Sequence, residues 1–199
     1  MPTAPDHPAP AAPAYVTIRP ATPADVAALD AMIPASVRAL SRPLYDDAQI
    51  ESAVRHMFGV DSQLVADGTY LVARTSDGAV AGCGGWSRRR TLYGGDRMKT
   101  GDDPLLDPAV DAARIRAFFV HPAHARRGVG TALLAACAEA AHAAGFRQLR
   151  LVATLPGERL YAAHGFVAVE RDVATMPDGV RVPVVVMQRA TRPGAPASR

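Results

Sequence analysis

The segment between residues 113 and 144 constrains the fold more than any other part of the chain. Ala113 to Val120 is an apolar run that predicts a strand. From Gly130 to Ala144 the apolar residues recur on one helical face, and Gly145 follows as a helix stop. The loop between them carries Arg126-Arg127-Gly128-Val129-Gly130-Thr131. The sequence therefore places an arginine- and glycine-containing loop directly between a strand and a helix N-terminus.

The beginning of that helix has the properties of an anion-binding site. The first N–H groups of a helix have no acceptor within the helix and carry a partial positive charge. Gly128 and Gly130 let the backbone approach a ligand closely. Arg126 and Arg127 add positive charge for phosphate oxygens. Together these features predict a site for a pyrophosphate.

Three kinds of phosphate-binding loop compete for this pattern. A P-loop requires Lys after its second glycine, where this chain has Thr131. A dinucleotide-binding fold would have a third glycine near Leu133 and an acidic residue at the end of the next strand, which here ends with Ala153-Thr154. The remaining interpretation is a coenzyme A loop. The alternative without a ligand is an ordinary helix start that contains glycine.

Periodicity along the rest of the chain predicts a single α/β domain at residues 15–190. We expect strands at 15–19, 69–74, 79–87, 113–120, 148–153, 166–171 and 180–189, and helices after Thr22, after Asp46 or Asp47, at 130–144 and at 156–163. Pro34 is expected to kink or end the first helix. This order of elements implies a mixed sheet with helices on its faces, an α/β fold of the α+β mixed-sheet kind.

Composition restricts the remaining classes of function. The Pro/Ala-rich segments 1–14 and 191–199 predict disordered tails. A dispersed net charge of +3 argues against a nucleic-acid partner. The chain lacks an apolar run long enough to span a membrane, and its N-terminus does not resemble a secretory signal. Cys83 and Cys137 lie in apolar runs, which predicts two buried thiols and suits a cytoplasmic location.

The chain resembles the Gcn5-related N-acetyltransferase (GNAT) family at three motifs. The pyrophosphate loop of that family follows the pattern Gln/Arg-x-x-Gly-x-Gly/Ala after a strand that ends in Val-x-Pro. This chain has Val120-His121-Pro122 and then Ala125-Arg126-Arg127-Gly128-Val129-Gly130, with Ala125 in place of Gln or Arg. Leu160 to Phe166 matches the family's tyrosine followed by Gly-Phe, and Ile18 to Asp25 matches its opening segment. The specific motifs cover roughly 113–170, and the weaker match of element order covers 15–190.

The resemblance implies a GNAT-like single domain with splayed central strands flanked by helices. The strands at 113–120 and 148–153 would part, and the pantetheine of acetyl-CoA would lie between them like an added strand. The residues implied to bind the co-substrate are Phe118, Phe119, Val120, Arg126, Arg127, Gly128, Val129, Gly130 and Thr131. Thr154 stands where relatives often have an Asn that contacts the coenzyme. No metal is expected, because no further ligand set accompanies His121 and His124. Many relatives are dimers, so a homodimer stays open.

Tyr161 is the candidate general acid under this resemblance. When an amine attacks a thioester, a thiolate leaves and must be protonated, and a phenol of pKa about 10 can donate to a thiolate of pKa about 8.5. The alternative is a tyrosine that only packs on the coenzyme. Many relatives carry a Glu base in the strand where this chain has Arg114-Ile115-Arg116. His121 and His164 are the alternative bases, each competing with a loop histidine without a chemical role.

The acceptor is predicted to be an amine, with a small molecule favoured over a protein. Its pocket would be lined by Trp86, Arg88 and Tyr93, which lie at or near the long polar stretch 88–112. The alternatives are a core tryptophan and a solvated run of arginines. A different class of function also stays open, namely a domain of the same fold that binds acyl-CoA without catalysing transfer.

Overall fold

The computed structural model describes residues 12–98 and 101–191, so the predicted tails at 1–14 and 191–199 lie almost entirely outside the described residues. The strands are β1 (Val16–Pro20), β2 (Tyr70–Thr75), β3 (Val80–Ser87), β4 (Ala113–Val120), β5 (Gln148–Thr154), β6 (Val167–Thr175) and β7 (Arg181–Ala190). The α-helices are α1 (Val26–Ser41), α2 (Asp47–His56), α3 (Ser62–Ala66), α4 (Val129–Ala143) and α5 (Leu155–Ala163), with 3₁₀ turns η1 (Pro23–Asp25), η2 (Asp96–Met98) and η3 (Pro122–His124).

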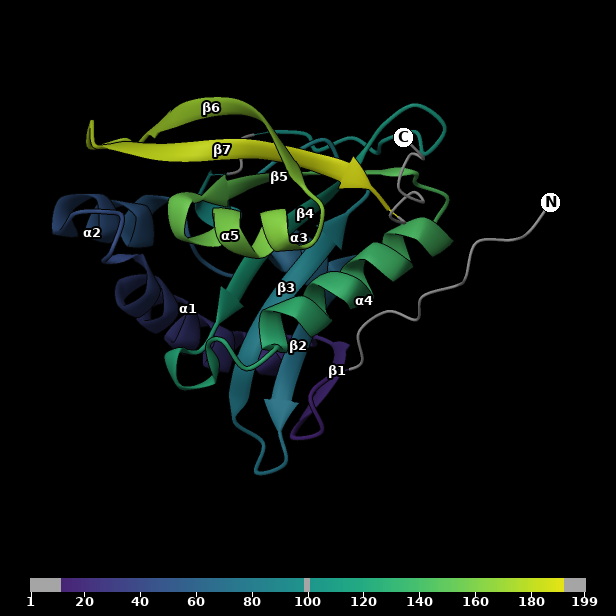
Figure 1. Cartoon of the computed structure of the whole chain (residues 1–199), viewed down its shortest axis with the longest axis horizontal. Coiled ribbons are helices and arrows are strands. Elements are labelled where there is room, and N and C mark those ends of the chain that lie inside the picture. The colour runs from purple at the N-terminus through teal and green to yellow at the C-terminus, as the bar shows by residue number, and fades with distance from the viewer. Residues whose placement is uncertain (1–11, 99–100, 192–199) are drawn as a thin grey trace, which may run out of the picture.

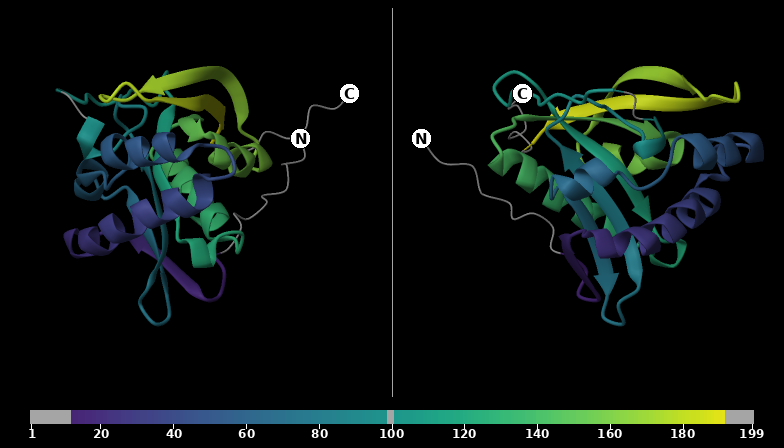
Figure 2. Two further views of the ribbon diagram at one scale, coloured as in Figure 1. Left: turned by 90° about the vertical axis from the view of Figure 1, so that its left-hand side faces the viewer. Right: turned by 180° about the vertical axis from the view of Figure 1, so that it is seen from behind.

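The strands form one mixed sheet covered by helices on both faces. Their order is β1-β2-β3-β4-β5-β7-β6, and every neighbouring pair is antiparallel except β4 and β5, which are parallel. Helices α4 and α5 lie on one face, and α1, α2 and α3 lie on the other (Figures 1 and 2). The prediction of a single mixed α/β sheet with flanking helices is confirmed.

Each face of the sheet has its own apolar core. On one side the helix residues Leu29, Ile33 and Leu64 pack with Tyr70 and Val72 of β2. On the other side Leu134 and Phe146 pack with residues of β4, β5 and β7. Cys83 and Cys137 are free thiols buried one in each core, which confirms their predicted burial. Among the described residues, none of the helices combines the length and apolar character needed to cross a bilayer.

Two local features of the helices need a physical explanation: Pro34 does not end its helix, and a short helix is present that no periodicity predicts. Helix α1 does not end at Pro34 but continues to Ser41. A proline inside a helix costs about 3 kcal/mol, and the apolar stripe that α1 buries against the sheet offsets it. Helix α3 was not expected, because five residues are too few to show a period. It begins at an N-cap, where the Asp61 side chain accepts a hydrogen bond from the Leu64 amide at 3.2 Å.

The sheet opens between β4 and β5. These parallel strands pair only at Ala113–Leu149 and Arg114–Arg150, whereas β5 pairs with β7 along its whole length. Beyond Arg114 the two strands diverge, so the backbone edge of each faces an opening instead of a neighbour. The splayed central strands are thereby confirmed, and the opening positions the candidate site.

Candidate active site

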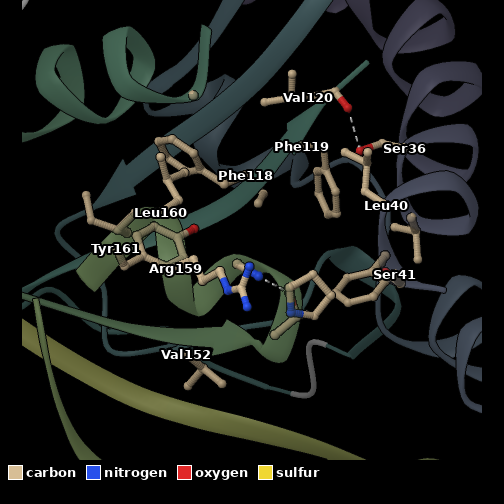
Figure 3. A pocket seen from close by; sticks show the side chains of 18 of the residues that line it. Ser36, Leu40, Ser41, Phe118, Phe119, Val120, Val152, Arg159, Leu160 and Tyr161 are labelled. Atoms are coloured by element: carbon tan, nitrogen blue, oxygen red, sulfur yellow. Dashed lines mark hydrogen bonds between the residues drawn. The ribbon is translucent and has the colours of Figure 1, made fainter. Parts of the chain in front are cut away.

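A cavity of about 700 Å³ occupies the opening between β4 and β5 and extends between α1 and α5. In the close-up, Phe118, Leu160 and Tyr161 lie on one side of it, and Ser36, Leu40 and Phe119 lie on the other (Figure 3). Its walls therefore come from segments that are far apart in the sequence.

A β-bulge shapes the strand that forms the cavity floor. Phe119 pairs with Cys83 and Arg116 pairs with Gly85, so Ala117 and Phe118 together oppose the single residue Gly84 of β3. Ala117 has φ 53°, a left-handed conformation that is costly for a residue with a Cβ. Such a conformation persists only when its surroundings hold it, which marks this point of β4 as a candidate functional position.

The bulge is supported from both faces of the sheet. On the α1 side, the hydroxyl of Tyr70 donates to the Ala117 carbonyl at 3.2 Å, and the Tyr70 side chain is fully buried. On the α5 side, the Phe118 ring lies directly over Gly84, where an added Cβ would overlap it. Glycine is thus required at position 84, because the Phe118 ring occupies the space that a side chain would need.

The loop after β4 presents backbone donors to the cavity. Arg126 has φ 62° and Gly128 has φ 85°, and α4 begins immediately afterwards without a side-chain cap. The first N–H groups of α4 therefore have no acceptor within the helix. Gly130 and Thr131 line the cavity, so the positive end of α4 faces this space.

Tyr161 of α5 reaches the cavity from the core beneath it. Its ring packs edge-on against Phe118 at 6.3 Å and Phe166 at 5.7 Å between centroids. Burial, with a smaller contribution from Cys137, raises the pKa of its hydroxyl. The hydroxyl makes no hydrogen bond to the part of the chain that the structure describes, and Tyr161 lines the cavity. It is therefore a protonated phenol at neutral pH with a free donor.

Most of the predicted site residues come together around this cavity. Those that line it are Phe118, Phe119, Val120, Arg126, Gly128, Gly130, Thr131, Tyr161 and Tyr93. The Val120 carbonyl already accepts a hydrogen bond from the Ser36 hydroxyl at 2.7 Å, which occupies one of its two lone pairs. The roles assigned to these residues stay predictions.

Four predicted residues lie outside the cavity lining. The guanidinium of Arg127 stacks over the ring of Tyr15, 4.4 Å from its centroid. Val129 is fully buried below the loop, and Trp86 packs in the core against Phe146. Arg88 is exposed on the polar stretch after β3.

Strand β4 carries two arginines and no carboxylate that could act as a base. Arg116 is buried and pairs with Asp61 at 2.7 Å, and it also donates to the Gly94 carbonyl at 2.7 Å. It ties the strand to α3 and to the loop segment that walls the cavity. Of the two candidate histidines, His164 lines the cavity and His121 does not. The Nδ1 of His164 lies 2.7 Å from the Leu160 carbonyl.

One wall of the cavity was missed by the sequence patterns. It is largely apolar and comes from α1, from the turn that follows it, and from the segment after α2, with Val37, Leu40, Pro43, Leu44, Met57 and Phe58 as members. Leu40 near the end of α1 and Leu44 in the turn after it are exposed apolar residues, an exposure that no local sequence pattern reports. Arg159 of α5 was also missed and is an exposed cation at the cavity.

Among the described residues, no group of three or more His, Cys, Asp or Glu side chains is arranged to hold a metal ion. The titratable side chains that the structure places in the cavity lining are Tyr93, Arg116, Arg126, Arg159, Tyr161 and His164. The charged groups among them are arginines, so the site is electrically positive and suits an anionic ligand.

Comparisons with known proteins relate the chain to acetyltransferases. The model of the acetyltransferase (GNAT) domain matches residues 66–168. A search of curated proteins returned no match. Among solved structures, the chain is similar to a GCN5-related N-acetyltransferase from Rhodopseudomonas palustris, with TM-score 0.66 and 23% identity over 89% of this chain and 96% of that one.

Two further similar structures were determined with acetyl-CoA. One is yncA, a putative acetyltransferase from Salmonella typhimurium, with TM-score 0.58, 20% identity and coverage of 92% of this chain and 98% of that one. The other is a phosphinothricin acetyltransferase from Sinorhizobium meliloti, with TM-score 0.59, 24% identity and coverage of 88% of each chain. At these identities the likeness shows the fold.

Proposed function

Because the chain belongs to the GNAT acetyltransferase family, we propose that it transfers an acetyl group from acetyl-CoA to a primary amine of a small molecule or peptide. The amine attacks directly, with both substrates bound together. One observation carries this proposal: the glycine loop, the opening between β4 and β5, and the free hydroxyl of Tyr161 all face the same cavity. A transfer reaction needs a coenzyme site and a proton donor within reach of each other.

The proposal assigns the co-substrate to the opening and the loop. The pantetheine lies along the unpaired edges of β4 and β5, where backbone groups can bond its amides as a neighbouring strand would. The pyrophosphate lies at the beginning of α4, where free N–H groups and Arg126 favour an anion. This arrangement leads the thioester toward Phe118 and Tyr161.

The chemistry assigned to the site is aminolysis of a thioester. A neutral amine nitrogen bonds to the carbonyl carbon, the carbon–sulfur bond breaks, and the thiolate takes the Tyr161 proton, which solvent then restores. Because burial keeps that phenol protonated, it is available as an acid at neutral pH. The amine loses its proton to water or to His164, the histidine at the cavity.

A second candidate is a domain that binds acyl-CoA without transferring the acyl group. It is favoured by the position of Arg116, which occupies β4 with a buried ion pair to Asp61 where relatives often have a glutamate base. Such a domain would bind acetyl-CoA with the same loop and release no thiol.

Two measurements separate these candidates. Calorimetry with acetyl-CoA and, separately, NADH tests the coenzyme assignment, and tight NADH binding without acetyl-CoA binding would overturn it. Thiol release from acetyl-CoA across a panel of amines, with the product identified by mass, tests the transfer. Acetyl-CoA binding with no acetylated product from any amine would favour the non-catalytic domain.

A further inference from the structure

Two arginines lie side by side where β4 and β5 begin to part. Arg114 and Arg150 are in-register partners on these parallel strands, so their backbones are about 4.8 Å apart and their side chains leave the same face of the sheet. Register continues this row on both sides, to Ser87 of β3 and to Gln188 of β7. Two guanidinium groups thus stand within a polar row across the sheet.

Neither arginine forms a direct ion pair with a carboxylate in the part of the chain that the structure describes. Both are partly buried, and the Nε atom of each is buried without a hydrogen-bond partner. Burial and the charge of Arg150 lower the pKa of Arg114, and exposed Arg90 adds to that repulsion. Two like charges at this spacing are destabilising in a sheet unless an anion neutralises them.

Arg116, the next arginine on the same face of β4, differs from this pair because its charge is neutralised by a carboxylate. It is paired with Asp61 at 2.7 Å. Two carboxylates partly offset the lowering of the Arg114 pKa without forming an ion pair with it. Asp103 accepts the Thr91 amide at 2.7 Å and lies 3.8 Å from Arg116, and Asp111 accepts the Asp107 amide at 2.9 Å.

The pair lies next to the cavity, although neither arginine is part of its lining. Arg114 and Arg150 each precede by two residues a cavity-lining residue on the same face of the sheet, Arg116 on β4 and Val152 on β5. Two residues of strand span about 7 Å. A molecule bound in the opening between the strands would therefore end within about one such span of the pair.

We propose that Arg114 and Arg150 form a binding site for an oxyanion, a carboxylate or a phosphate, and that the acceptor supplies it. Each guanidinium group offers donors in a planar fork that matches two oxygens of such a group. The choice of the acceptor as the source rests on the proposed function, whereas the oxyanion site itself does not. A free anion such as phosphate has the same chemistry and is the alternative source.

The binding arm uses inorganic phosphate alone, added to the full chain at constant ionic strength. A ligand at ten times its Kd is expected to raise the Tm of the wild type by about 3–6 °C. The double variant Arg114→Gln/Arg150→Gln should lose this shift. The matched control Arg55→Gln/Arg181→Gln removes two exposed arginines, so it has the same charge change and should keep the shift.

The kinetic arm compares one amine that bears a terminal carboxylate with its methyl ester. If the acceptor supplies the anion, the arginine double variant raises KM for the acid about tenfold or more and leaves the ester unchanged. Arg150→Lys keeps the charge and loses the planar group. Its KM for the acid should lie between the values of the wild type and the arginine double variant. Phosphate stabilisation without this acid-specific effect would assign the site to a free anion.

The proposal falls if phosphate shifts the wild type and the arginine double variant equally and the acid and ester also respond equally. Failure of acetyl transfer to every amine would instead refute the proposed function. In that case the phosphate shift still decides whether the oxyanion site exists.

Discussion

Replacing Tyr161 with Phe removes one oxygen atom from the cavity wall. The ring contacts with Phe118 and Phe166 remain, because they involve only carbon atoms of the tyrosine. The lost hydroxyl has no hydrogen-bond partner among the described residues, so its removal leaves no buried group unsatisfied. The free energy of unfolding should therefore change by less than about 1 kcal/mol.

The expected effect is on the chemical step. A general acid contributes about 10²–10⁴ in rate, so kcat and kcat/KM should fall together by that factor, while acetyl-CoA affinity changes less than about threefold. Single-turnover kinetics should be used, because slow product release can hide a smaller defect. Burial raises the pKa of Tyr161, so its acid form persists through neutral pH and is lost only at a pH above the ordinary range of a tyrosine.

The matched comparison is Tyr45→Phe, a second buried tyrosine whose hydroxyl bonds the Leu155 amide at 2.9 Å and the Pro183 carbonyl. That variant should lose stability rather than the chemical step. A single-turnover rate for Tyr161→Phe within about threefold of the wild type, on a good acceptor, would refute the assignment and leave water as the proton source.

Three further predictions follow from the site. Gly84→Val should displace the Phe118 ring and the bulge, which should lower stability by about 1–3 kcal/mol in denaturant unfolding and should lower kcat. Unchanged activity would refute a role of the bulge in catalysis. Arg126→Ala should weaken acetyl-CoA binding about tenfold in calorimetry, and Arg127→Ala should weaken it less, because only Arg126 lines the cavity; equal losses would contradict the geometry. Arg116→Gln should cost about 3–5 kcal/mol by stranding its buried carboxylate partner, and a loss below about 1 kcal/mol in urea unfolding would show the pair to be weakly coupled.

Local sequence patterns predicted the central segment well. The predicted strand at 113–120 matches β4, and the predicted helix start at Gly130 lies one residue from the observed start at Val129. The signals were short-range: an apolar run, two glycines and a helix stop. The order of elements also sufficed for a mixed sheet, because it combines strand–helix–strand connections with hairpins.

The parts that sequence could not supply depend on contacts between distant residues. The bulge at Ala117 arises from the register of β4 against β3, and no local pattern marks a left-handed alanine. The partner of Arg116 lies fifty-five positions away at Asp61, so the strand arginine could not be recognised as neutralised. Arg127 was indistinguishable from Arg126 until Tyr15 was placed beneath it.

The two residue pairs between β4 and β5 have a mechanical consequence. Within the described residues they are the only ladder that joins the leaf formed by β1 to β4 to the leaf formed by β5 to β7, and the apolar cores on both faces supply the other connections. A molecule that formed hydrogen bonds to both free edges would connect the two leaves along the opening. Binding could then be measured as slower amide hydrogen exchange on the facing edges of β4 and β5 than in the empty protein.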